Sequence, residues 1–221
     1  MEVCMNKTWI TIIRIAFFGI FLFLMLIGKP FIWLALYTAS LVSALLFGRI
    51  YCGFMCPINT VMGPAEFLSK KMNTQTEKTP KWLSSGVFAW VFLGISIALM
   101  LLFKKAMKVD LPIIPIWIAV GFLVTLRYKP YVFHNLICPF GTLQSIFGKK
   151  PLFSKKVDKE TCIGCRLCEK ACPSDAIKVF SETKKATITA NLCHQCTNCK
   201  DVCPKDAILY KRAEYHLPDI E

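Results

Sequence analysis

The last third of the chain carries two copies of one cysteine pattern, which restricts the fold more than any other feature. Each copy reads C-x-x-C-x-x-C-x-x-x-C-P: CIGCRLCEKACP begins at Cys162, and CHQCTNCKDVCP begins 31 residues later at Cys193. Three cysteines so spaced can bind three irons of a cubane cluster, while the fourth reaches the cluster of the other copy. The segment is therefore predicted to hold two [4Fe-4S] clusters.

This crossing rule assigns four ligands to each cluster. The first set is Cys162, Cys165, Cys168 and Cys203, and the second is Cys193, Cys196, Cys199 and Cys172. The sequence after each motif also repeats, as PSDAI and PKDAI, so we expect one loop, one short helix and one strand per copy. Zinc sites use two separated ligand pairs, and disulfides do not explain a doubled run followed by proline. Residues 158–212 resemble the bacterial two-cluster ferredoxin module.

The rest of the chain is too apolar for an ordinary soluble domain. Hydrophobic residues make up 55% of the 221 residues, and four apolar stretches approach the roughly 20 residues that cross a hydrocarbon core. They cover residues 8–28, 31–50, 82–103 and 111–128. Pro112 and Pro115 would delay the start of the fourth. The predicted fold is an α-helical membrane bundle of four helices over residues 1–157, joined to a small α+β two-cluster ferredoxin domain over residues 158–221.

The distribution of lysine and arginine predicts the orientation in the membrane. The net charge of +13 lies entirely in residues 1–157, because residues 158–221 contain ten basic and ten acidic residues. This argues against a nucleic-acid partner. With both termini on one side, twelve basic residues flank the spans there and four flank them on the other side. The positive-inside rule then predicts a multi-pass inner-membrane protein with cytoplasmic termini and a cytoplasmic ferredoxin domain, where thiols stay reduced.

Arg14 is a basic residue inside the first apolar stretch. The favoured interpretation is a side chain that snorkels to the membrane surface, and the alternative is a part of a substrate site. Because no small-residue cleavage site follows this stretch, we expect a retained span and not a signal peptide.

A second pair of motifs follows the second and fourth apolar stretches. CGFMCP contains Cys52 and Cys56, and HNLICP contains His134 and Cys138 at the same spacing. The membrane part thus reads as a duplicated hairpin that brings both motifs to one side. The four residues are a candidate Cys3His site for a metal, a further iron–sulfur centre or a dithiol couple. Alternatively, they are packing residues at helix ends. His194, inside the cluster loop, is not needed as a ligand.

Apolar spans with such motifs after the second and fourth, followed by a two-cluster ferredoxin, resemble the NapH-like family of quinol dehydrogenase membrane components. The membrane half of the NosR-type proteins is similar. The resemblance covers essentially the whole chain, and it implies electron transfer between the quinone pool or cytoplasmic donors and proteins across the membrane. The chain departs from the pattern at His134, which replaces a motif cysteine.

We therefore expect a membrane electron-transfer subunit that relays electrons between its clusters and either membrane quinone or a redox partner enzyme, within a membrane complex. The sequence contains no dinucleotide fingerprint, phosphate loop or haem-attachment motif, so substrate chemistry is expected of a partner. A redox-sensing or maturation factor for a partner metalloenzyme is the alternative. Candidates to line a quinone site are Tyr51, Trp33, Arg49, Arg127 and His134, although interfacial aromatic and basic residues more often anchor a protein.

Overall fold

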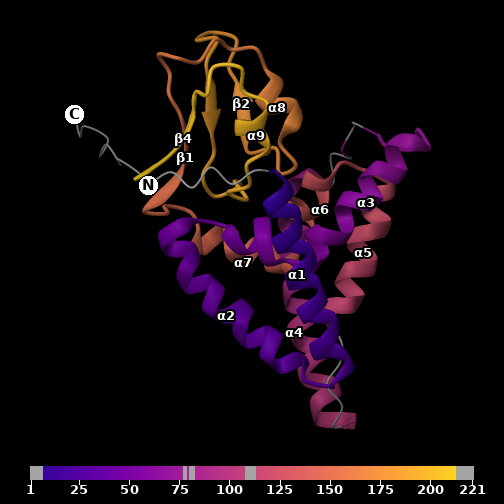
Figure 1. Ribbon diagram of the computed structural model, residues 1–221. Coiled ribbons are helices and arrows are strands. Elements are labelled where there is room, and N and C mark those ends of the chain that lie inside the picture. Colours follow the sequence, from indigo (N-terminus) through magenta and orange to yellow (C-terminus); the bar gives the residue numbers. More distant parts are fainter. Residues whose placement is uncertain (1–6, 77–78, 80–82, 108–112, 213–221) are drawn as a thin grey trace.

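A computed structural model describes residues 7–76, 79, 83–107 and 113–212 of the protein. The expected starts of the third and fourth spans, Trp82 and Leu111, lie outside these residues. The start of the first expected domain, at residue 1, and the end of the second, at residue 221, also lie outside them. The helices form one part of the molecule, and the cysteine-rich domain is stacked on one end of them (Figure 1).

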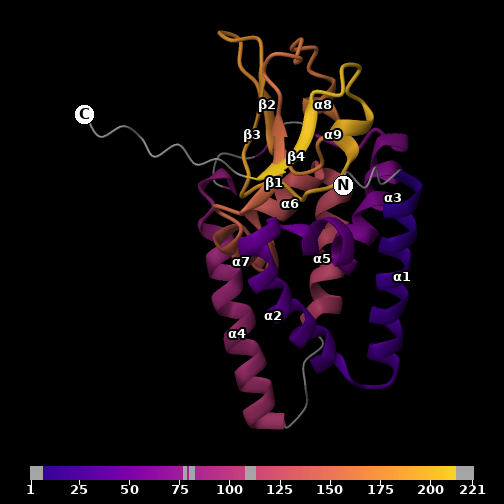
Figure 2. The ribbon, with the colours of Figure 1, turned by 60° about the vertical axis from the view of Figure 1, so that its left-hand side comes forward.

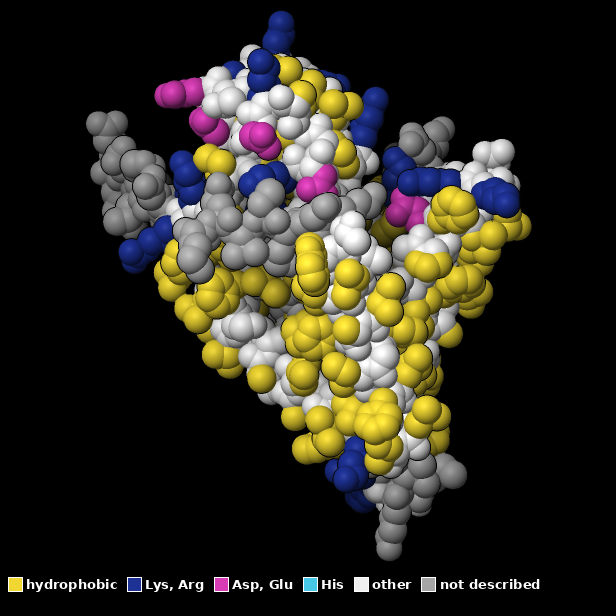
Figure 3. All heavy atoms as spheres, in the orientation of Figure 1, with side chains coloured by type: hydrophobic (Ala, Val, Ile, Leu, Met, Phe, Trp, Pro, Cys, Tyr) yellow, Lys and Arg dark blue, Asp and Glu magenta, His cyan; other side chains and the backbone are white. Residues whose placement is uncertain are grey.

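Among the described residues, three helices are long and apolar enough to cross a membrane: α1 (Lys7–Leu26), α2 (Pro30–Phe47) and α4 (Val87–Met107). Gly28, with φ of 74°, makes the tight turn between α1 and α2, and Pro30 begins α2. Apolar side chains cover the surface of these helices, whereas most charged ones gather at the ferredoxin end and at the opposite tip (Figure 3). The helical membrane part is thereby confirmed.

The fourth expected span, residues 111–128, is described only from residue 113 onward. Helix α5 (Ile113–Arg127) contains 15 residues, which corresponds to about 22 Å at the usual helical rise against a hydrocarbon core of about 30 Å. Pro115 lies in its first turn, where proline is tolerated. The count of four spans therefore remains a prediction from the sequence.

The two hairpins, α1–α2 and α4–α5, are each followed by a broken segment and an amphipathic helix. In the first copy these are the π-helix η1 (Tyr51–Met55) and α3 (Pro57–Lys71); in the second they are α6 (Pro130–Leu136) and α7 (Pro139–Phe147). A short 3-10 helix, η2 (Leu83–Ser85), precedes α4. Helix α3 packs against α5, and α7 packs against α2 and α4. Each hairpin thus holds the amphipathic helix of the other, as expected for a duplication.

The ferredoxin domain contains two antiparallel strand pairs and two short helices. Its elements are β1 (Phe153–Val157), α8 (Leu167–Ala171), β2 (Ile177–Val179), β3 (Ala186–Ile188), α9 (Asn198–Asp201) and β4 (Ile208–Arg212). Strand β1 pairs with β4, and β2 pairs with β3. Each cysteine motif thus contains one short helix and is followed by one strand. Strand β1 precedes the expected boundary at residue 158, but it pairs with β4 and so belongs to the ferredoxin domain.

The first residue of α1, both membrane motifs and the ferredoxin domain lie at the same end of the bundle (Figures 1 and 2). The turn between α1 and α2 and the last turn of α4 lie at the opposite end (Figure 2). The two motifs that the sequence separates by a full hairpin are therefore brought to one face, directly beneath the ferredoxin domain.

Candidate iron–sulfur centres

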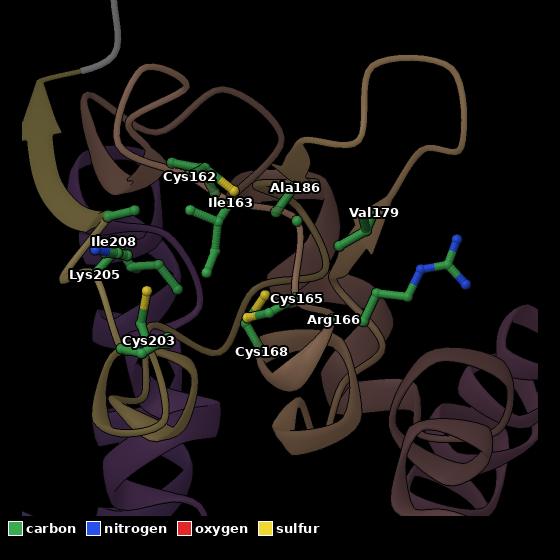
Figure 4. A pocket seen from close by; sticks show the side chains of 14 residues that line it. Cys162, Ile163, Cys165, Arg166, Cys168, Val179, Ala186, Cys203, Lys205 and Ile208 are labelled. Carbon is green, nitrogen blue, oxygen red and sulfur yellow. The ribbon is translucent and has the colours of Figure 1, made fainter.

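The first cavity of the ferredoxin domain is lined by Cys162, Cys165, Cys168 and Cys203. The sulfurs of these residues surround a central space, with Cys203 entering from the end of α9 (Figure 4). The remaining lining is mostly aliphatic. Three cysteines of the first motif and the last cysteine of the second motif therefore meet in one cavity, which is the arrangement that a crossed ligand set requires.

The second cavity is lined by the complementary cysteines, Cys172, Cys193, Cys196 and Cys199. The Ala176 amide donates to the sulfur of Cys172 at 3.3 Å, and the Gln195 amide donates to that of Cys193 at 3.4 Å. Amide donors of this kind stabilise thiolates that bind iron. His194 also lines this cavity.

The loop of the second motif turns through Gln195, which has φ of 56° where the first motif has Gly164 at 71°. A left-handed residue with a side chain costs about 1–2 kcal/mol. The Gln195 side chain offsets this cost with two hydrogen bonds to β1: it donates to the Ser154 hydroxyl at 3.0 Å and accepts from the Lys155 amide at 3.2 Å. The loop is thereby tied to the sheet.

The donor chemistry of both cavities fits a [4Fe-4S] cluster. All eight cysteines are free of disulfide bonds, and soft thiolates are the ligands that iron–sulfur clusters use. Burial raises the pKa of Cys199 to about 12, so the charge of a bound metal is needed to hold its thiolate. Among the described residues, no three His, Cys, Asp or Glu side chains are close enough together to hold a single metal ion. The two sets would hold two clusters.

The second cavity lies against the helical part. A Cβ on Gly53 would collide with the carbonyl oxygen of His194. A Cβ on Gly48 would lie 2.8 Å from the side-chain amide nitrogen Nε2 of Gln195. The Asn135 side chain donates to the carbonyl of Ser174 at 2.8 Å. These contacts join both membrane motifs to the loops that carry Cys172 and Cys193.

The first cavity is the more exposed of the two. The contacts just described with the helices involve loop residues of the second cavity, whereas Cys165 and Ile163 at the rim of the first are exposed, Ile163 by 57%. The two cavities are nevertheless neighbours, because Cys168 and Cys199 share one core and interact electrostatically. We call the first the distal site and the second the proximal site.

Two arginines lie at the junction between the proximal site and the helices. Arg49 is completely buried and donates to Asn135 at 3.3 Å and to the carbonyls of Asn191 and His134 at 3.4 Å each. Arg14 is half-buried, and its Nε donates to the carbonyl of Gly53 at 2.7 Å. This bond corrects the interpretation of Arg14 as a snorkelling residue, because its side chain is directed to a motif of the protein.

Two histidines meet at the same junction. The rings of His134 and His194 pack edge to face, with centroids 4.7 Å apart. Asn59 donates to the carbonyl of Cys52 at 2.8 Å, so its Oδ1 is free to accept from Nε2 of His134 at 3.1 Å. Burial, together with Arg49 and Arg14, lowers the pKa of His134 to about 3. Both ring nitrogens of His194 lack a hydrogen-bond partner among the described residues.

The three cysteines of the membrane motifs are buried in one core with Tyr37 and Tyr51. The two motifs have the same backbone geometry: Cys56 has φ, ψ of −69°, 118° and Cys138 has −68°, 114°, each directly before the proline that begins a helix. In the structure, His134 hydrogen-bonds to Asn59, and the three cysteines lie in the core. That Cys52, Cys56, His134 and Cys138 form one site remains a prediction.

The five candidates for a quinone site are not directed to one space. The Trp33 indole donates to the Tyr51 hydroxyl at 3.0 Å in the core. Arg127 donates to the carbonyl of Thr74 at 2.8 Å at the exposed end of α5. Arg49 and His134 belong to the junction with the proximal site.

The chain combines apolar helices with a domain at one end of them that contains two sets of four cysteines. This combination defines a membrane-associated iron–sulfur protein. Residues 137–210 match the family described as a 4Fe-4S dicluster domain. Residues 30–75 and 111–160 match a 4Fe-4S binding domain, once in each hairpin. With these domains and the relatives below, the chain is similar to the NapH-like ferredoxin-type proteins.

An uncharacterised protein of Methanocaldococcus jannaschii is 33% identical over 61% of this chain and 55% of its own length. The ferredoxin-type protein NapH of Haemophilus influenzae is 29% identical over 59% of this chain and 49% of its own. The methylamine utilization ferredoxin-type protein MauN of Methylorubrum extorquens is 28% identical over 57% and 47%. The matches thus span about half the length of these relatives. No solved structure matches the chain significantly. The likeness to NosR-type proteins remains an expectation.

Sequence reasoning missed His194 and undervalued Arg14. A charge in an otherwise apolar helix was the available signal for Arg14. No local signal distinguishes His194, because its partner His134 lies 60 residues away in the sequence.

Proposed function

We propose that this iron–sulfur electron-transfer protein relays electrons between a soluble redox partner and the membrane, where quinone or a membrane-bound redox enzyme exchanges them. Its ligands would be Cys162, Cys165, Cys168 and Cys203 at the distal site, and Cys172, Cys193, Cys196 and Cys199 at the proximal site. The observation that carries the proposal is the docking of the proximal site on the membrane motifs, with the distal site facing away from them.

When bound, [4Fe-4S] clusters exchange single electrons at potentials that their surroundings set. The chain's own residues hold the two sites adjacent, since Cys168 and Cys199 share one core. They also exclude water from the proximal site, where Cys193 and Cys196 are buried, whereas Cys165 at the distal site is exposed. This supports an order in which the soluble partner meets the distal site and the membrane partner is served through the proximal one.

The membrane motifs would complete the route. Cys52, Cys56, His134 and Cys138 are all buried, and His134 contacts His194 of the proximal loop. We infer that these four residues form a redox or ligand site for a further centre, a dithiol couple or a quinone, between the proximal site and the membrane partner. Their role as a site, and not as packing residues alone, is what the following experiment tests.

The full-length protein in nanodiscs is reduced with dithionite and freed of excess reductant, and a ubiquinone analogue is then added. Reoxidation should restore the visible absorbance of the clusters. Cys56→Ser and His134→Ala should retain about eight irons per chain but slow reoxidation about tenfold or more. Ferricyanide, which can meet the exposed distal site, should reoxidise all variants equally.

Normal reoxidation by quinone in both variants would make the motif residues packing residues. A wild-type protein that ferricyanide reoxidises but quinone does not would exclude quinone as the membrane partner. A redox-sensing or maturation factor would give that second result.

A further inference from the structure

The junction holds two positive charges that have no negative side-chain partner among the described residues. Arg49 is fully buried, its three hydrogen bonds go to neutral oxygens, and its Nε has no partner. Arg14 binds a neutral carbonyl. Among the described residues, no carboxylate forms an ion pair with either arginine. A buried guanidinium without a counter-charge is costly, so an anionic group is expected close by.

The proximal site, whose cysteine thiolates would be anionic, lies at this junction. Arg14 binds the carbonyl of Gly53, and Gly53 lies against the carbonyl of His194, the residue after Cys193 of that site. Arg49 binds the carbonyl of Asn191, two residues before Cys193. His194 follows Cys193, lines the same cavity, and has two ring nitrogens without partners among the described residues.

We propose that Arg14, Arg49 and His194 raise the reduction potential of the proximal [4Fe-4S] site, the arginines as counter-charges and His194 as an N–H donor on the cavity wall. The inference rests on the proposed ligand assignment of that site. It assigns these three residues to positioning and tuning, without any ligand role.

The physical reason is the charge added on reduction. One electron makes a thiolate-ligated centre more negative by one charge, and buried cations and N–H donors stabilise that added charge most in a medium of low dielectric constant. The distal site has one half-buried cation, Lys185, whose Nζ donates to the carbonyl of Cys162 at 2.6 Å, but no fully buried cation lines it among the described residues. Arg166 and Lys205 border it, but both are exposed, and Arg166 points away from the cavity (Figure 4). Water and salt screen such charges.

Redox titrations monitored by EPR, on the full-length protein in nanodiscs, would test the inference. Arg14→Gln and His194→Phe should each shift the midpoint potential of the proximal site to more negative values and leave that of the distal site unchanged. Arg14→Lys, which keeps the charge, should recover most of the shift. Arg166→Gln is the matched control beside the distal site and should move neither potential. Arg49→Gln is a weaker test, because Arg49 also holds three carbonyl and amide oxygens.

Iron and sulfide analysis separates two kinds of failure. If wild-type protein contains a single cluster, the ligand assignment itself is wrong, and the inference fails with it. If both clusters are present and neither Arg14→Gln nor His194→Phe moves the proximal potential, the inference is overturned while the proposed relay stands. Equal shifts at both sites would also overturn it, since they would show a general effect on the protein.

Discussion

At the scale of single residues, the junction contains a glycine at a close backbone approach and buried polar side chains without hydrogen-bond partners among the described residues. Gly53 has no side chain where the backbone of the cluster loop approaches, and this close approach explains a glycine inside the CGFMCP motif. His194 and Arg49 are buried with polar atoms that lack partners among the described residues. Such groups are rare in stable proteins and are typical of sites that bind something.

Gly53→Ala should weaken the docking of the ferredoxin domain on the helices. The added Cβ would collide with the carbonyl oxygen of His194, and overpacking of this kind costs about 1–3 kcal/mol. Thermal unfolding followed through the visible absorbance should show a lower midpoint, and limited proteolysis should cut more readily before β1. Gly94→Ala in α4 is the control, because a Cβ there meets nothing within 4 Å. Equal behaviour of the two variants would contradict the close approach.

At the scale of elements, both halves of the chain use the same device, an exchange between two copies. Helix α3 packs on α5 of the second hairpin, and α7 packs on α2 of the first. In the ferredoxin domain the last cysteine of each motif lines the cavity of the other. In the ferredoxin domain neither motif lines a complete site alone. In the helical part α3 also contacts α1, and α7 also contacts α4, so each amphipathic helix bridges the two hairpins.

The exchange of cysteines predicts reciprocal losses. Cys172→Ala should abolish the proximal cluster, although Cys172 belongs to the first motif, and Cys203→Ala should abolish the distal one. Each variant should retain about four irons, because the other set of four cysteines is intact. EPR spectra of the reduced proteins distinguish the two clusters. Loss of the distal signal in Cys172→Ala would show that each motif supplies all its own ligands.

At the scale of the whole molecule, the fold places both membrane motifs and both cysteine motifs at one end. Both membrane motifs and the ferredoxin domain lie there, whereas the opposite end carries the short α1–α2 turn and the last turn of α4, with Lys104 and Lys105 (Figure 2). Most basic residues of the membrane part flank the functional end. We propose on this basis that this end faces the cytoplasm.

Reporter fusions would test the proposed orientation. Green fluorescent protein fused after residue 221 should fluoresce, and alkaline phosphatase at the same position should be inactive, because it requires the periplasm to form its disulfides. Alkaline phosphatase inserted after Lys29 should give the opposite result. An active phosphatase at the C-terminus would reverse the orientation and place the cysteines in an oxidising compartment.

The sequence by itself determined the two [4Fe-4S] sites, the apolar helices and the duplicated hairpin. These features are local or periodic: the spacing of cysteines within one loop, the length of an apolar run and the repetition of a short motif are visible without the fold. For the fourth apolar run the start at residue 111 lies outside the described residues, and helix α5 covers Ile113–Arg127 of it.

The tertiary structure alone decided which site lies against the membrane helices and what surrounds it. Arg49 and Asn191 are 142 residues apart in the sequence, and Arg14 and Gly53 are 39 apart. The pairing of His134 with His194 depends equally on the docking of the two parts. Contacts of this kind join residues that are distant in the sequence, and no local pattern around one residue records which distant residue will face it.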